Sequence, residues 1–89
     1  MPKRKTYRDY LNLPEGKRGR IFLRVPEVNG FFQITPFEED GKIIYQFRKY
    51  VGMAGGHVAS GADYILDAPP KLGNYEIAEL GEVPQELRG

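Results

Sequence analysis

The chain has 89 residues, no Cys and one His, which fits a single domain and excludes disulfides, thiolate metal sites and His-rich metal centres. No apolar run approaches the ~20 residues of a membrane helix, and no apolar stretch follows the basic N-terminus. We therefore expect a cytoplasmic protein with neither membrane anchor nor signal peptide. The net charge of +1 hides an uneven distribution, because residues 1–24 carry a net +6 and residues 62–89 a net −4.

Residues 1–19 are a basic arm and loop in which we expect one short helix. Thr6 followed three residues later by Asp9 is a weak capping box, with Asp in place of the usual Glu or Gln. Helical spacing gives the segment a narrow apolar stripe, formed by Tyr7, Tyr10 and Leu11. Pro14 disfavours helical angles at the residue before it, so the helix should end there.

Residues 20–80 have the pattern of a β core. In residues 20–25, Ile21, Leu23 and Val25 face one side and alternate with Arg20, Phe22 and Arg24 on the other, as in a half-buried strand. Pro36 ends the second strand or marks an edge, and Asp40-Gly41 is typical of a tight hairpin. Five strands are expected, at residues 20–25, 31–35, 42–51, 62–66 and 74–80. The predicted fold is mainly β: a small, strongly bent, five-stranded antiparallel sheet or partly open barrel, SH3-like or OB-like, with a short N-terminal helix or arm.

Residues 81–89 form an acidic tail. We expect this tail to fray, or to form one helical turn after Pro84.

The sequence gives little support to catalysis. His57, Ser60 and Asp63 are spaced three apart, but the neighbouring glycines oppose the helix that would place them on one side. The glycine-rich residues 52–57 lack the Gly-Lys-Ser/Thr ending of a phosphate loop. Three neighbouring acids, Glu38 to Asp40, fit a solvated turn better than a metal site. We therefore expect no enzyme, no catalytic residue, no cofactor and no metal.

One face of the first three strands is a better candidate for a binding site. If the alternation holds, this face carries Arg20, Phe22, Arg24, Phe31, Gln33, Gln46, Arg48 and Tyr50. Rings interleaved with guanidinium groups suit unpaired nucleic acid, because bases stack on rings and cations meet phosphates. Alternatively the terminal helix, through Tyr7, Tyr10 and Leu11, covers Phe22 and Phe31 and makes a second small core.

These patterns predict a small non-enzymatic module that docks a larger protein, as a subunit, adaptor or inhibitor, through its charged ends and its aromatic and Arg face. The expected partner-binding residues are Arg18, Arg20, Phe22, Arg24, Phe31, Arg48 and Tyr50. Binding of single-stranded DNA or RNA by the same face is the alternative, and no membrane partner is expected. The uneven charge also predicts cationic and anionic poles, which would allow head-to-tail self-association.

Overall fold

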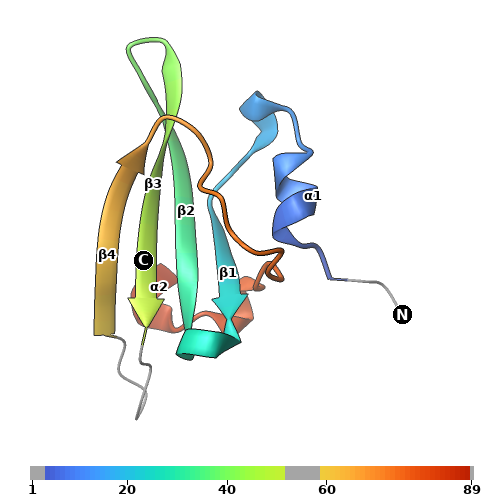
Figure 1. Cartoon of the computed structure of the whole chain (residues 1–89), viewed down its shortest axis with the longest axis vertical. Helices are drawn as coiled ribbons and strands as arrows, with labels where there is room; N and C mark the ends of the chain where they lie inside the picture. Colours follow the sequence, from blue (N-terminus) through green and yellow to red (C-terminus); the bar gives the residue numbers. More distant parts are fainter. Residues whose placement is uncertain (1–3, 52–58, 89) are drawn as a thin grey trace.

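The chain folds as an open, four-stranded antiparallel sheet with a short helix on one side (Figure 1). This computed structural model describes residues 4–51 and 59–88. The strands lie in the order β1 (Ile21–Val25), β2 (Gly30–Glu39), β3 (Lys42–Val51) and β4 (Ala59–Leu66). The helices are α1 (Tyr7–Leu11), α2 (Gln85–Arg88) and the 3-10 turns η1 (Glu15–Lys17), η2 (Pro26–Val28) and η4 (Leu80–Glu82). None of these described helices is long enough to span a bilayer.

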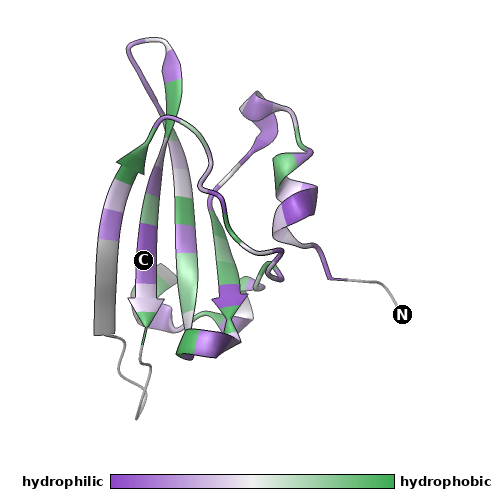
Figure 2. Cartoon of the chain, viewed as in Figure 1, coloured by the Kyte–Doolittle hydropathy of each residue, from purple (hydrophilic) through white to green (hydrophobic). Residues whose placement is uncertain are grey.

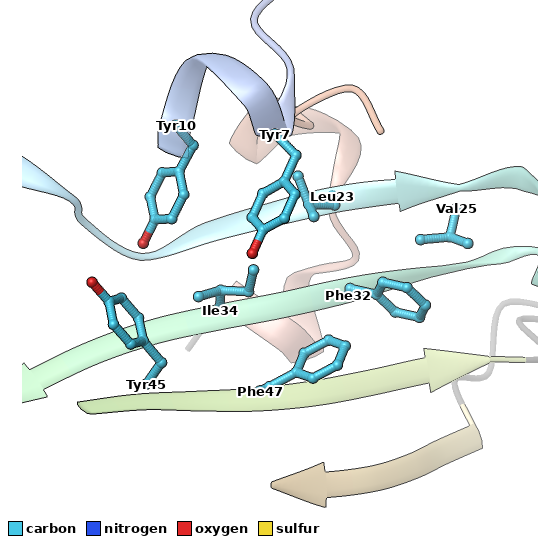
Figure 3. Packing of buried hydrophobic residues seen from close by; sticks show 8 residues of the cluster. All are labelled: Tyr7, Tyr10, Leu23, Val25, Phe32, Ile34, Tyr45 and Phe47. Atoms are coloured by element: carbon cyan, nitrogen blue, oxygen red, sulfur yellow. The ribbon is translucent and has the colours of Figure 1, made fainter. Parts of the chain in front are cut away.

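The main core lies on the side of the sheet that α1 covers, which we call the helix face. Alternate residues of each strand point to this side, as the sequence pattern predicts. The buried cluster contains Tyr7, Tyr10, Leu23, Val25, Phe32, Ile34, Tyr45 and Phe47 (Figure 3). Tyr7 and Tyr10 extend from α1 onto the strands, so the short helix is held by its two rings.

The start of α1 confirms the predicted capping box. The backbone N–H of Thr6 donates to the carboxylate of Asp9 at 2.9 Å. The hydroxyls of the two buried tyrosines donate to backbone carbonyls, Tyr7 to Pro70 at 2.6 Å and Tyr10 to Gly19 at 2.9 Å. Burial raises the pKa of Tyr7 to about 12 and that of Tyr10 as well. Leu11, the third member of the predicted stripe, is exposed, because the helix ends there.

The β2–β3 hairpin is as predicted, with a two-residue loop at Asp40 and Gly41. Both residues have positive φ, as a type I′ turn requires. Of the two alternatives predicted for Pro36, the end of the strand is wrong, since β2 continues to Glu39, and the edge position is the one found. The pairing of β1 with β2 stops at Ile34, so Pro36 has a strand neighbour on one side only and its missing N–H breaks no ladder there.

The predicted fifth strand and the barrel are not confirmed. Residues 74–80 form only isolated bridges, one from Glu76 to Thr6 and one from Ile77 to Leu23. Ala78 N–H then donates to Phe22, and the chain turns away into η4. In the described residues β1 and β4 are not paired with each other, so the sheet stays open.

The residues after β4 wrap around the sheet (Figure 1). Leu72 and Tyr75 pack against the core of the helix face. Residues 76–78 lie along the outer edge of β1, and the chain then passes to the opposite side, where Ala78, Val83 and Leu87 pack on Phe22 and Phe31. We call this opposite side the tail face and residues 79–88 the tail. The single helical turn expected after Pro84 is present as α2, but the tail is packed, not frayed.

Candidate functional site

The strand register places most of the predicted binding residues on the tail face. Phe22 pairs with Gln33, which pairs with Arg48, and Arg24 pairs with Phe31, which pairs with Tyr50. The guanidinium group of Arg20 lies 5.5 Å from the centre of the Phe22 ring. Six of the seven predicted residues therefore share one face, namely Arg20, Phe22, Arg24, Phe31, Arg48 and Tyr50.

Arg18 lies apart from these six residues. Its guanidinium group donates to the Tyr45 hydroxyl at 3.0 Å and to the Leu11 carbonyl at 2.8 Å. Tyr45 belongs to the core of the helix face, so Arg18 ties the end of α1 to that core. Arg18 therefore does not extend the aromatic face, and its expected part in partner binding stays a prediction.

The aromatic rings of the tail face are covered. Phe22 is 2% exposed and Phe31 8%, packed with Ala78, Val83 and Leu87. A cover was one of the two alternatives drawn from the sequence, but the tail supplies it instead of the N-terminal helix. The reason is that the apolar residues of α1 and the rings of Phe22 and Phe31 lie on opposite sides of the sheet.

Opposite charges meet beside this cover. The carboxylate of Glu82 pairs with Arg4 and, at 3.2 Å, with Arg24. Basic residues of the first 24 positions thus contact an acid of the last 28, and the expected separation into two poles is wrong at this contact. Burial disfavours ionisation of Glu82, but hydrogen bonds from Arg4 and from the Glu79 backbone and the charges of Arg4 and Arg24 outweigh it, so its pKa is lowered.

This lowered pKa predicts that the tail loosens in acid. A carboxyl group with a depressed pKa in the folded state stabilises the fold above its ordinary pKa, and this contribution is lost as the pH falls. We expect the methyl signals of Val83 to shift below pH 4.5, the ordinary value for Glu82, when followed by NMR from pH 7 to pH 3. Glu82→Gln should remove this step, whereas Glu39→Gln, on the distant hairpin, should keep it. A step of the same size in the Glu82→Gln variant would contradict the assignment.

The two long edges of the sheet differ. At the outer edge of β1, Arg24 N–H donates to Glu76 at 2.9 Å, and Ala78 N–H donates to Phe22 at 2.8 Å. Residues 75–77 are in turn bonded to the N-terminal arm, through Tyr7 N–H to Tyr75 and Ile77 N–H to Lys5, both at 2.8 Å. By contrast β4 pairs only with β3, and among the described residues no segment lies on its other side.

The open edge carries exposed apolar side chains at its end. Ile65 is 61% exposed and Tyr64 45%, and the tip of β4 is coloured as hydrophobic in Figure 2. Next to them Asp63 accepts a hydrogen bond from Arg48 at 3.2 Å. We call Asp63, Tyr64 and Ile65 together with the unpaired backbone of β4 the open edge.

Tyr64 is held in place from the helix face. The ammonium group of Lys49 lies 5.7 to 5.8 Å from the ring centres of Phe32, Phe47 and Tyr64. Phe47 and Tyr64 also contact each other, with ring centres 6.0 Å apart. A cation over several rings stabilises their arrangement, so the end of β4 is anchored although its outer side is free.

Sequence reasoning missed Tyr64 and Ile65 as site residues. Three consecutive apolar residues, Tyr64 to Leu66, cannot all face the core of an alternating strand. That break in alternation was the available signal, because at least one of these side chains had to face solvent or a partner.

Some sequence candidates lie outside the described residues. These are His57 and the glycine-rich residues 52–57, and the side chain of Ser60 is likewise undescribed. Glu38, Glu39 and Asp40 lie at the hairpin end and are exposed.

Comparison of the chain with models of known protein families, with curated proteins and with solved structures gives no significant match. The function is therefore argued from the geometry of this chain.

Proposed function

We propose that the protein is a non-enzymatic module that docks a larger protein, and that it does so by accepting an extended segment of that partner along β4. The open edge is the observation that carries this proposal. Strand addition uses the free N–H and C=O groups of an edge strand for affinity and exposed side chains for specificity. Ile65 and Tyr64 supply such side chains on the two faces.

Edge strands are usually protected against pairing by charges, proline, bulges or short length. β4 has eight residues, which is longer than the average strand of about five to six. Its sequence contains no proline and one charged residue, Asp63, which already interacts with Arg48. A register shift in the pairing of β3 with β4 is a further protective feature, and it lies toward the start of β4, away from Ile65.

Binding of single-stranded nucleic acid has less support. Bases stack on accessible rings, and Phe22 and Phe31 lie under the tail. The acidic tail occupies the same face as the arginines, where it would repel a phosphate backbone. Head-to-tail self-association is weakened as well, since Arg4 and Arg24 are already paired with Glu82 of the same chain.

The proposal predicts that Ile65→Lys abolishes capture of the partner without unfolding the chain. Lysine on an edge strand opposes pairing with a further strand, and Ile65 is too exposed for its loss to disturb the core. Affinity capture from a host lysate treated with nuclease should recover a protein on the native chain, and we expect at least about tenfold less on the variant, a loss of roughly 1.4 kcal/mol of binding free energy.

Leu13→Lys is the matched control, because Leu13 is also exposed, at 43%, but follows α1, which lies at the β1 side of the sheet and away from β4 (Figure 1). This variant should capture as much partner as the native chain. Equal capture by Ile65→Lys would contradict docking at β4, and capture that disappears with nuclease would favour the nucleic-acid alternative.

A further inference from the structure

The tail is attached to the sheet differently from the segment that precedes it. Residues 75–78 make backbone hydrogen bonds to β1 and to the N-terminal arm. The backbone hydrogen bonds described for residues 79–88 all stay within the tail: Glu82 to Glu79, Val83 to Leu80 and Leu87 to Pro84. The tail is therefore held on the sheet by side chains, and it can detach without breaking the sheet ladder.

The side-chain contacts of the tail have the pattern of a bound peptide. Val83 and Leu87, four residues apart, pack on the rings of Phe22 and Phe31. Beside them the Glu82 carboxylate lies between two arginines, Arg4 and Arg24. Arginine clusters bind the carboxylates of acidic segments, and apolar side chains four residues apart anchor short helical segments in grooves, so the tail combines two known modes of peptide recognition.

The hold on the tail is modest. The side chains of Arg4 and Arg24 are 41% and 46% exposed, so both ion pairs are in contact with solvent and are screened by salt. Leu80, the third apolar residue of the tail, faces solvent and adds no anchor. Next to the tail lies an open hollow of about 350 Å³, lined in part by Arg24, Phe31 and Glu82, so the face has room beyond what the tail fills.

We propose that Phe22, Phe31, Arg4 and Arg24 form a second binding surface, and that it takes an acidic segment of a partner protein with two apolar side chains spaced four residues apart. In the free protein the tail occupies this surface as an intramolecular competitor. The occupant is argued from charge complementarity: the two arginines at the rim match a carboxylate, and the rings match aliphatic side chains. This proposal is independent of docking at β4.

Competition by the tail has a measurable consequence. A ligand binds only the fraction of molecules in which the tail has detached, so its apparent affinity is reduced by that fraction. A change that weakens the tail without touching the rings or the arginines should therefore strengthen binding of an acidic peptide.

The test uses the full chain with Val83→Asn and a synthetic peptide of residues 78–89 as the probe. We expect this variant to bind the peptide at least about tenfold more tightly than the native chain. Leu80→Asn is the matched control, since Leu80 is exposed in the same tail, and it should bind like the native chain. A peptide with Lys in place of Glu82 should not bind, and binding of the native peptide should weaken as salt is raised. Equal peptide affinity for native and Val83→Asn chains would overturn the proposal.

Native-state hydrogen exchange of the unmodified chain keeps the proposal testable if Val83→Asn does not fold. Detachment of the tail predicts that the amides of Val83 and Leu87 exchange at least about 100-fold faster than those of Leu23 and Ile34. Equal rates would overturn it, because the tail would then open only with the whole fold. A concentration-dependent dimer with exchanged tails would also overturn it, since a second copy would then be the occupant.

Discussion

Gly30→Ala is expected to destabilise the folded chain by about 3 kcal/mol, near the upper end for overpacked sites. A Cβ atom at this position would lie 1.8 Å from the carbonyl oxygen of Tyr50 and 3.0 Å from the Cα of Val51. Both atoms belong to the backbone of β3, so no side-chain rotation relieves the clash. The start of β2 would have to separate from β3, next to the residues Phe31 and Tyr50 that pair across the two strands. Urea denaturation of the variant and the native chain measures the difference.

Gly16→Ala and Gly19→Ala are the controls for this substitution. No atom lies within 4 Å of a Cβ built at either position, and neither residue has positive φ. The free energy of unfolding of both variants should lie within about 1 kcal/mol of the native value. A small increase is expected, because alanine restricts the unfolded chain more than glycine does. If Gly30→Ala behaved like these controls, the close approach of β2 to β3 would be wrong.

Phe22→Ala is expected to cost about 3–5 kcal/mol, the range for removing a buried Phe ring. The ring is packed between β1 and the tail, with Val83 against it and the Arg20 guanidinium group over it. A domain of this size is stable by about 5–15 kcal/mol, so a loss of this size is a large part of the total. Thermal unfolding followed by circular dichroism would show it as a lower midpoint.

Phe37→Ala makes the same chemical change on β2, where the ring is 39% exposed. Its expected cost is about 1 kcal/mol or less, as for most exposed positions. A cost for Phe22→Ala no greater than that for Phe37→Ala would mean that the tail does not cover the tail face.

Much of the sheet could be predicted from local patterns. The bounds of β3, the hairpin at Asp40-Gly41 and the capping box at Thr6 all depend on residues close together in the sequence. Residues 74–80 contain enough apolar residues to predict a fifth strand. The strand does not form, because this segment lies between β1 and the N-terminal arm for only a short stretch and makes only isolated bridges there. That outcome depends on long-range packing, which alternation does not report.

The candidate site was predicted only in part. Alternation in β1, β2 and β3 was enough to place Phe22, Phe31 and Arg24 on one face. Alternation could not show what covers that face, because Val83 and Glu82 lie about 50 to 60 residues away in the sequence. It also could not show which edge of the sheet stays open, since this follows from the path of residues 67–78 around β1 and not from β4 itself.

The most direct test of docking at β4 is hydrogen exchange of the chain alone and in complex with the captured partner. We expect the added amide protection to concentrate in β4 at Asp63 and Ile65. Residues of an antiparallel strand bond alternately to its two sides, and Tyr64 and Leu66 already face β3, so Asp63 and Ile65 carry the backbone groups that are free in the isolated chain. Protection that instead appeared in β1 and β2, with β4 unchanged, would contradict docking at the open edge.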